Sequence, residues 1–443
     1  MTKLQKVRVT VMGLGRHGGG VGVVRYLAER GARVTVTDLQ PADALTDSLG
    51  AVADLPIERY RLGGHDPGDF ETADCVVVNP AVPPGHPLLR LARSRGVPVT
   101  TEIDLLLDGC PTRLAAVTGS NGKSTTCAML AEILRADGRP CHLGGNFGIS
   151  LLPHVDTMHR EDWVVLELSS FQLARLSRST RGADVAIVTG CTPNHLDWHG
   201  TLDEYVRAKQ RILTAQSTDS LAILCDHDPR LREWMPLVRG RLLSLRDDAP
   251  LDGLGVPGLH NRQNARLAAT AAEAIGCTRQ AIARALHEFP GLPHRLGCIG
   301  EVQGRQFYDD SKSTTPEATA VALETLAGRT WLLAGGHDKG ADLELIAGAL
   351  ARHGAGACFF GAAADRLTVA AAQHASRAPV SRKKTLSEAL HWCWQRSQPG
   401  DRILLSPGCA SFDQFRDYVH RAEVFARLVN AMKFRDSPDF ASV

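Results

Sequence analysis

One short stretch, residues 114–126, limits what this chain can fold into more than any other part of the sequence. An apolar segment leads into a glycine loop, the loop ends in a lysine followed by hydroxyl residues, and a helix is expected from about Cys127. Glycine lets backbone N–H groups converge on phosphate oxygens, and the N-terminus of a following helix adds its positive dipole. The stretch therefore predicts a strand–loop–helix unit that binds a nucleotide polyphosphate.

Each residue type after the strand suits one part of that ligand. Lys123 can reach the outer phosphates, and the hydroxyl of Ser124 or Thr125 can ligate Mg²⁺. The common phosphate-loop pattern has a glycine where this chain has Val117, so the loop is shorter than in ordinary ATPases and GTPases. This spacing points to a narrower group of nucleotide-binding proteins. The loop residues themselves are Gly119, Ser120, Asn121 and Gly122.

Length and composition limit the remaining possibilities. The 443 residues suit roughly three domains, and a hydrophobic fraction of 44% is enough for packed cores. A net charge of only +2 gives no reason to expect a nucleic-acid partner. No secretion signal or apolar run of transmembrane length is apparent, so we expect no membrane insertion. The eleven cysteines are scattered without a Cys-x-x-Cys pair, which favours reduced thiols in a cytoplasm.

The N-terminal part has the pattern of a Rossmann-like unit. A strand is expected over 7–13, a helix over 21–30 and a second strand over 33–38, which ends in Asp38. The glycine-rich loop after the first strand suits a diphosphate, with Asp38 near a ribose or a uracil. A strand–turn–helix without a ligand is the alternative. The loop residues in question are Gly15, Arg16 and His17.

Two proline-containing dipeptides, Asn79-Pro80 and Pro83-Pro84, indicate further loops in this N-terminal part. They are expected at strand ends, where open α/β sheets bind their ligands.

Polar residues also follow the predicted strands of the central part. Glu167 ends an apolar segment, where a carboxylate suits Mg²⁺. The run 194–199 contains two histidines and is either a metal site or a structural loop, because its Asn and Asp residues are equally good turn or cap residues. Lys209 lies in a helical pattern, and by itself a lysine on a helix is expected on a solvated face. Asn264 calls for the same caution.

The C-terminal part repeats the alternation of strands and helices and predicts another doubly wound α/β domain. Strands are expected over 306–309, 330–335 and 402–406. Lys312 and Lys339 follow the first two of these strands and have hydroxyl residues or glycines beside them. Together they suit a small ligand that carries carboxylates.

The complete set of motifs resembles the Mur ligases, ATP-dependent amino-acid ligases of peptidoglycan precursor synthesis. The resemblance spans nearly the entire chain. Glu167–Leu173 and Ser411–Phe415 favour the branch that adds D-glutamate, and the Asp-Asn-Pro-Arg signature of the diaminopimelate-adding branch is missing. The motifs are Gly119-x-x-Gly-Lys-Ser-Thr125, Glu167–Leu173, Asn194-His-Leu-Asp197, Tyr205-x-x-Ala-Lys209, Gly291-Leu-Pro-His-Arg295, Asp310-Ser-Lys312 and Ser406–Phe415.

The resemblance implies three α/β domains. These are an N-terminal Rossmann-like domain for a UDP-sugar over 1–98, a central phosphate-loop domain with a mostly parallel sheet for ATP and Mg²⁺ over 99–296, and a C-terminal Rossmann-like domain for the amino acid over 297–443. It also implies a cytoplasmic, monomeric ligase that joins D-glutamate to UDP-N-acetylmuramoyl-L-alanine. The reaction would pass through an acyl phosphate and release ADP and phosphate.

The resemblance assigns roles residue by residue. The implied catalytic and metal-binding residues, around two Mg²⁺ ions, are Lys123, Ser124, Thr125, Glu167, His195 and Lys209, the last as a carbamate formed with CO₂. The implied ATP contacts outside the phosphate loop are Asn264, Arg295, Asp310 and Lys312. The implied UDP-sugar contacts are Gly15, Arg16, His17, Asp38 and Asn146. The implied amino-acid contacts are Thr314, Lys339, Ser411, Phe412 and Tyr418.

The chain departs from the family pattern in its first domain and at one position of its C-terminal domain. The first glycine loop is about two residues longer than the family pattern, and Leu39 and Gln40 stand where the family has a threonine and an arginine at the uracil nucleotide. Thr315 also replaces a more usual asparagine. Two alternatives stay open: a related ligase that adds another amino acid, such as L-glutamate, and a nucleotide-binding module without ligase activity.

Overall fold

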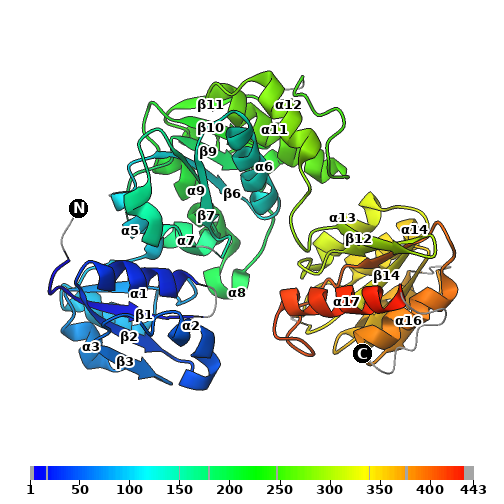
Figure 1. Cartoon of the computed structure of the whole chain (residues 1–443), viewed down its shortest axis with the longest axis horizontal. Coiled ribbons are helices and arrows are strands. Elements are labelled where there is room, and N and C mark those ends of the chain that lie inside the picture. Colours follow the sequence, from blue (N-terminus) through cyan, green and yellow to red (C-terminus); the bar gives the residue numbers. More distant parts are fainter. Residues whose placement is uncertain are drawn as a thin grey trace. The chain divides into compact units, whose positions relative to one another are not determined.

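The computed structural model describes residues 4–15, 18–148, 150–177, 180–245, 248–338, 340–374 and 378–433. The chain divides into two compact units, one formed by Met1–Gly255 with His260–Phe289 and the other by Val256–Leu259 with Pro290–Val443. The first unit contains two sheets, drawn in blue and in cyan to green in Figure 1, and the second contains one sheet, in yellow to red.

The N-terminal sheet has five parallel strands in the order β3-β2-β1-β4-β5. Strand order reverses between β1 and β4, and ligands bind at such a switch point in open α/β sheets. The strands are β1 (Arg8–Met12), β2 (Arg33–Asp38), β3 (Arg59–Leu62), β4 (Cys75–Val78) and β5 (Val99–Thr100). The helices are α1 (Gly19–Glu29), η1 (Ala42–Leu45), α2 (Thr46–Gly50), α3 (Pro67–Glu71), α4 (Pro87–Ser94) and α5 (Glu102–Gly109).

The middle sheet has six parallel strands in the order β11-β10-β9-β6-β8-β7. The strands are β6 (Arg113–Thr118), β7 (Cys141–Gly145), β8 (Trp163–Glu167), β9 (Val185–Val188), β10 (Leu221–Leu224) and β11 (Arg241–Leu243). The helices are α6 (Lys123–Ala136), η2 (Leu152–Thr157), α7 (Ser170–Arg175), α8 (Leu196–His199), α9 (Leu202–Thr214), α10 (Pro229–Arg232), η3 (Met235–Leu237), α11 (Leu259–Ala274) and α12 (Arg279–Glu288).

The C-terminal sheet has six strands in the order β12-β13-β17-β14-β15-β16, parallel except for the antiparallel pair β12–β13. The strands are β12 (Gly297–Val302), β13 (Arg305–Asp309), β14 (Thr330–Gly335), β15 (Gly356–Phe360), β16 (Val380–Lys383) and β17 (Arg402–Leu405). The helices are α13 (Pro316–Thr325), α14 (Glu344–His353), α15 (Ala364–Gln373), α16 (Leu386–Arg396) and α17 (Tyr418–Met432).

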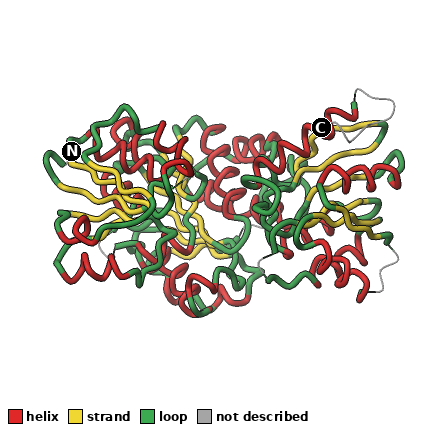
Figure 2. The backbone as a smooth tube through the Cα atoms, turned by 90° about the horizontal axis from the view of Figure 1, so that it is seen from below, coloured by secondary structure: helices red, strands yellow, loops and turns green. Residues whose placement is uncertain are grey.

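Apolar side chains on alternate positions of the strands build a core on each face of this third sheet. On β14, Leu332 packs in a cluster with residues of α13, α14 and α15, whereas its neighbour Leu333 packs in a cluster with residues of α16 and α17. All six residues of β14 are buried, as expected for a central parallel strand covered on both sides. Figure 2 shows strands between helices in each part of the chain.

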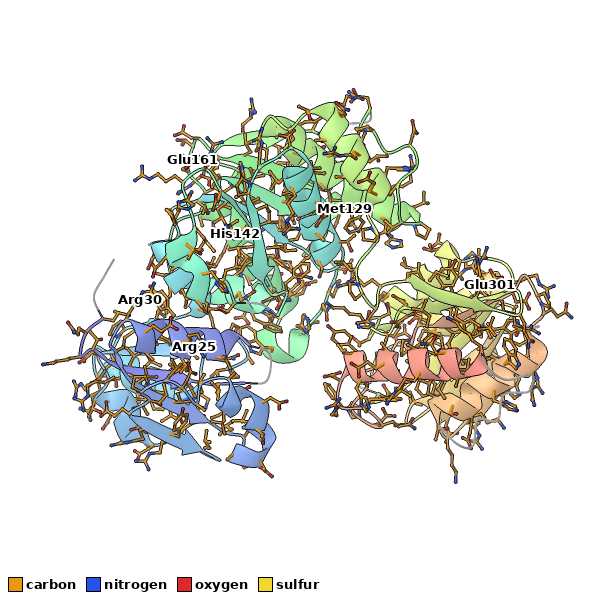
Figure 3. The ribbon with its side chains drawn as sticks, in the orientation of Figure 1. Arg25, Arg30, Met129, His142, Glu161 and Glu301 are labelled. Atoms are coloured by element: carbon orange, nitrogen blue, oxygen red, sulfur yellow. The ribbon has the colours of Figure 1, made fainter. Side chains whose placement is uncertain are left out.

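The middle domain is packed in the same way. Met129 of α6 is completely buried, and Figure 3 shows it in the interior of that domain. Arg30 of α1, also labelled in Figure 3, lies 3.7 Å above the ring of Tyr26 and pairs with Asp156 of η2. The N-terminal and middle domains therefore share direct side-chain contacts within the first unit.

The predicted α/β fold class with parallel sheets is confirmed, but two helix starts were placed too late. The phosphate-loop helix α6 begins at Lys123 rather than near Cys127, and α1 begins at Gly19 rather than at Val21. Both helices follow a glycine in the left-handed conformation, Gly122 or Gly18, which lets the chain turn directly into the helix. The domain boundaries after residues 98 and 296 stay predictions. No helix within the described ranges is long and apolar enough to span a bilayer.

Candidate active site

The phosphate loop connects β6, in the interior of the middle sheet, to α6. Gly119 has a φ of 150°, and a Cβ there would lie 1.9 Å from the hydroxyl of Thr189. Gly122 has a φ of 82°, and a Cβ there would lie 2.4 Å from Oδ1 of Asn264. Both positions thus require glycine for space as well as for conformation. Asn264 of α11, predicted to contact ATP, is buried directly against the end of this loop.

Two lysine side chains converge on one carbonyl group of the loop. Nζ of Lys123 donates to the carbonyl oxygens of Gly119 at 2.9 Å and Ser120 at 3.0 Å. Nζ of Lys209, from α9, donates to the same Gly119 oxygen at 2.8 Å. Lys209 is only 2% exposed, so the expectation that a lysine in this helical pattern is solvated is wrong. Burial, together with the charge of Lys123, lowers the pKa of Lys209 to about 7.

A buried carboxylate lies at the end of the neighbouring strand β8. Oε2 of Glu167 accepts a hydrogen bond from the Ser124 hydroxyl at 2.6 Å, and Oε1 accepts one from the side-chain amide of Asn146 at 3.0 Å. Glu167 is 3% exposed, and Thr125 is also buried at the start of α6. Asn146, predicted to contact the UDP-sugar, therefore belongs to the surroundings of the predicted metal residues.

This donor set fits Mg²⁺ bound with a nucleotide. Mg²⁺ is usually held by one or two carboxylates together with substrate phosphates, hydroxyls and water, not by a complete cage of protein ligands. Glu167 and Ser124 supply a carboxylate and a hydroxyl beside the phosphate loop. Among the described side chains, which do not include that of Asp197, there is no group of three or more His, Cys, Asp or Glu residues that could hold a metal.

The run 194–199 forms a turn and the short helix α8. His195 is exposed and adopts a left-handed conformation, with φ of 54°, as the N-cap of α8. Its ring lies 4.8 Å from that of Phe171. His199 is buried, and its Nε2 lies 2.9 Å from the hydroxyl of Ser170. The two histidines thus differ: His199 anchors the turn, and His195 is the one that faces solvent.

Tyr205 connects this turn to the lysines. Its ring packs edge-on against His199, and Nζ of Lys209 lies 4.8 Å from the ring centre. Its hydroxyl is 2.7 Å from that of Ser120, and burial raises its pKa to about 12. Tyr205 is therefore a neutral hydrogen-bonding partner of the phosphate loop.

In the N-terminal domain, Asp38 joins two loops. Oδ2 accepts the backbone N–H of Gly15 at 3.0 Å, and Oδ1 accepts that of Gln40 at 2.9 Å. The Ser48 hydroxyl also donates to the Gly15 carbonyl, at 2.7 Å. Asp38 was predicted to contact a ribose or a uracil, and here its carboxylate shapes the loop that would hold the diphosphate. Leu39 beside it is 65% exposed. The predicted contacts Arg16 and His17 lie outside the described residues.

In the C-terminal domain, Asp310 is buried where β13 ends. Its carboxylate accepts hydrogen bonds from the Ser406 hydroxyl at 2.7 Å and from the backbone N–H of Leu296 at 3.1 Å, and burial raises its pKa to about 6. Nζ of Lys312 lies 5.4 Å from the ring centre of Tyr418. Arg295 and Thr314, which flank β12 and β13 in the sequence, are both half-buried.

The predicted amino-acid contacts differ in exposure. Ser411 is 2% exposed, whereas Phe412, the next residue, is 67% exposed. Lys339 lies outside the described residues. The roles assigned to individual site residues stay predictions.

Arg421 of α17 was missed by the sequence analysis. It is completely buried and donates to the hydroxyl and carbonyl of Ser311, at 3.0 and 2.8 Å, and to the carbonyl of Cys409 at 3.1 Å. It therefore holds together the two loops that carry Lys312 and Ser411. Burial lowers its pKa to about 10. The available signal was its spacing, because Arg421 lies four residues before Phe425 on the buried stripe of an amphipathic helix.

The fold and this site define a class: a phosphate-loop protein of three α/β sheets, with two lysines and a buried carboxylate around the loop. Family models agree with that class and narrow it. The Mur ligase MurD-like N-terminal domain matches residues 7–101, the Mur ligase middle domain matches 117–249, and the Mur ligase glutamate ligase domain matches 294–409. The chain belongs to the Mur ligase family.

Individual relatives give the same result over the full length. The UDP-N-acetylmuramoylalanine–D-glutamate ligase of Solibacter usitatus is 36% identical over 98% of this chain and 100% of its own length. The enzyme of the same name from Symbiobacterium thermophilum is 35% identical over 97% and 99%. The crystal structure of MurF ligase from Thermotoga maritima in complex with ADP matches 98% of each chain, with a TM-score of 0.61 and 17% identity, and so shares the fold.

Proposed function

We propose that this chain is an ATP-dependent ligase that adds D-glutamate to UDP-N-acetylmuramoyl-L-alanine in peptidoglycan precursor synthesis. The full-length relatives bear the name of this activity. The observation in the structure that carries the proposal is the buried amine of Lys209 beside Lys123 and the Glu167–Ser124 pair, around one phosphate loop. A module that merely binds a nucleotide has no need of a second buried lysine there.

The chemistry explains why these residue types occur together. A carboxylate is a poor electrophile, so one of its oxygens first attacks the γ-phosphorus of ATP, the bond to the ADP oxygen breaks, and an acyl phosphate forms. Lys123 would neutralise the negative charge that develops on the transferred group. The amine of glutamate then attacks the acyl carbon, the carbon–oxygen bond to phosphate breaks, and the amine gives up a proton. The products are an amide, ADP and phosphate.

Ser124 and Glu167 would hold Mg²⁺, which supplies charge neutralisation on the phosphate oxygens when bound. We also propose that Lys209 becomes a carbamate. Its neutral amine nitrogen attacks the carbon of CO₂, one carbon–oxygen π pair moves to oxygen, and the nitrogen loses a proton. A pKa of about 7 leaves much of this amine neutral near physiological pH, as the attack requires. The product is a carboxylate-like group where the bare lysine now contacts Gly119.

The remaining assignments belong to the same proposal. The three ranges 1–98, 99–296 and 297–443 would serve the UDP-sugar, ATP and the amino acid, with His195 near a second Mg²⁺. We propose a monomer in the cytoplasm, and light scattering on the purified protein tests the monomer.

The deciding experiment measures ADP and phosphate release by the purified protein with ATP, Mg²⁺ and UDP-N-acetylmuramoyl-L-alanine. D-glutamate, L-glutamate and no amino acid are compared. We expect release that depends on the nucleotide sugar and selects D-glutamate. Selection of L-glutamate would keep the chemistry but change the substrate, and absence of substrate-dependent release in a protein that binds ATP would favour the nucleotide-binding module.

A further inference from the structure

The loop 79–84 of the N-terminal domain is held by two side chains of the middle domain. Nε1 of Trp198 in α8 donates to the carbonyl of Ala81 at 3.3 Å. The guanidinium of Arg175, the last residue of α7, donates to the carbonyl of Val82. Neither contact is accounted for by the proposed chemistry.

The Arg175 contact is made at a cost. Burial, with the nearby charge of Arg93, lowers the pKa of Arg175 to about 10. Its Nε atom is buried and, within the part of the chain that the structure describes, has no hydrogen-bond partner. A partly desolvated guanidinium set against a neutral carbonyl disfavours folding in comparison with one paired to a carboxylate. Such a group is expected where it does something other than stabilise the fold.

The loop itself lies at the ligand-binding edge of its sheet. It follows β4, next to β1 at the switch point. Asn79 opens the loop, and a Cβ added to Gly13 would lie 2.8 Å from the Cβ of Asn79. The side chain of Asn79 also accepts the N–H of Ala81 at 3.0 Å. A ligand seated in the glycine loop would therefore touch or order the 79–84 loop.

The other end of the contact is the helix that begins at His195. α8 has four residues, too few for its own hydrogen bonds to fix it. His199 anchors it to Ser170 in the middle domain, and Trp198 anchors it to the N-terminal domain. The ring centre of Phe171 lies 4.8 Å from that of His195 and 4.8 Å from that of Trp198. The position of His195 thus depends on both domains.

We propose that Trp198 and Arg175 are positioning residues that couple ligand occupancy of the N-terminal glycine loop to the placement of His195 beside the phosphate loop. The inference rests on the proposed function, in which a nucleotide sugar occupies the first domain. A sugar nucleotide that orders the 79–84 loop also fixes α8 through these two contacts. ATP bound at the phosphate loop would otherwise have to order α8 itself, and this free-energy cost is removed once the sugar nucleotide is bound. Binding of the two ligands becomes cooperative.

The test is calorimetric titration of the protein with a non-hydrolysable ATP analogue in the presence of Mg²⁺, with and without saturating UDP-N-acetylmuramoyl-L-alanine. The quantity compared is the coupling factor, which is the dissociation constant of the analogue without the nucleotide sugar divided by its dissociation constant with it. We expect a factor of about 5 or more in the natural protein. Trp198→Ala and Arg175→Met should bring it to about 2 or less, while the dissociation constant for either ligand alone changes little. Trp198→Phe, which keeps the ring and loses the N–H, should fall between.

Arg279→Met is the matched control. Arg279 is exposed on α12 and pairs with Asp248 at 3.0 Å, so its removal should leave the coupling factor unchanged. Substitution of a residue with only a structural role would alter the melting temperature or the affinity for each ligand alone, but not the coupling factor. If Trp198→Ala fails to fold, Trp198→Phe and Arg175→Met decide.

The possible failures are distinct. A natural protein that binds the nucleotide sugar but shows no coupling, or variants that retain the full coupling factor, would overturn this inference and leave the proposed function standing. A natural protein that does not bind the nucleotide sugar at all would overturn the proposed function, and the inference with it.

Discussion

Two strand–loop–helix units of this chain enter their helices through a glycine with nearly the same backbone conformation. Gly18 before α1 has φ and ψ of 81° and −26°, and Gly122 before α6 has 82° and −15°. Neither helix has a side-chain hydrogen bond at its N-cap. In both units a glycine N-cap, which supplies no side-chain acceptor, precedes the first N–H groups of the helix, and a helix N-terminus of this kind suits an anionic ligand.

The charged side chains that hydrogen-bond to the backbone of Gly119 and of Gly15, one residue in each loop, differ in sign. In the middle domain, Lys123 and Lys209 donate to the Gly119 carbonyl. In the N-terminal domain, the carboxylate of Asp38 takes the N–H of Gly15, and glycines follow the loop where the other has Lys-Ser-Thr. A glycine before a helix N-terminus suits phosphate in either loop, and we expect residues from neighbouring strands and helices to decide which loop can also transfer a phosphoryl group.

Removal of the lysine of the phosphate loop should have the largest effect. Lys123→Ala should lower ADP formation by roughly 1000-fold, because the charge developing on the transferred phosphoryl group loses its nearest cation. Binding of the nucleotide sugar should be unchanged, since the other loop does not use a lysine. Coupled-enzyme assay of ADP and calorimetry of the nucleotide sugar measure the two effects. Near-normal ADP formation would remove the middle loop from the chemistry.

Lys209→Ala should lower activity by on the order of 100-fold, since the carbamate is lost. Acetate or formate should restore part of it by supplying a carboxylate in the vacated space. In the natural protein at constant dissolved CO₂, activity should rise as the pH rises through about 7, because the amine becomes neutral above that value. Initial rates across pH and added acid are the measurement.

Lys123→Ala serves as the control for rescue, because its role requires a cation and no carboxylic acid can replace it. Full activity of Lys209→Ala without added acid would exclude the carbamate. Rescue of both variants would mean that the acids act elsewhere.

The positions of both glycine loops could be predicted from the sequence, because each loop has a local pattern of residues. Apolar segments bounded by glycine and polar residues placed β2 at 33–38, and the loop residues 119–122 marked the phosphate loop. The helix starts were misplaced because apolar periodicity begins later than the helix does. The left-handed conformation of Gly18 and Gly122, which sets the true start, has no periodicity to reveal it.

The burial of charged residues could not be predicted from local sequence patterns. Lys209 has the local sequence of a surface helix, and only the packing of α9 against the phosphate loop and Tyr205 buries it. Arg421 is buried by two loops more than a hundred and about ten residues away in sequence. The burial of such residues depends on contacts that are distant in sequence. For this reason only the resemblance to a family identified Lys209 as a site residue, and the helical pattern alone did not.

A matched pair of glycine substitutions tests the similarity of the two helix starts. Gly122→Ala and Gly18→Ala carry the same conformational cost of about 1–2 kcal/mol, because both glycines have positive φ. A Cβ at Gly122 also meets Asn264 Oδ1 at 2.4 Å, whereas one at Gly18 lies 3.1 Å from the Gly148 carbonyl. We expect Gly122→Ala to weaken ATP binding by more than about 10-fold and Gly18→Ala to weaken nucleotide-sugar binding by about that factor.

Each substitution should leave the other ligand's affinity unchanged, which calorimetry with each ligand checks. Loss of ATP binding in Gly18→Ala would contradict the assignment of separate ligands to the two loops.

The smallest expected effect comes from Asp38→Asn. The change keeps the shape of the side chain but leaves one acceptor oxygen for two backbone donors, Gly15 and Gln40, so one N–H faces an amide N–H₂ instead. Water can reach the partly exposed Gly15, and the penalty should be on the order of 1 kcal/mol. We expect the KM for the nucleotide sugar to rise about fivefold, while kcat and the KM for ATP stay unchanged.

Asp47→Asn, at an exposed acid of α2, is the control and should change none of these constants. A lower kcat with an unchanged KM would instead place Asp38 in the chemistry, and the N-terminal loop would no longer differ in kind from the loop that carries Lys123.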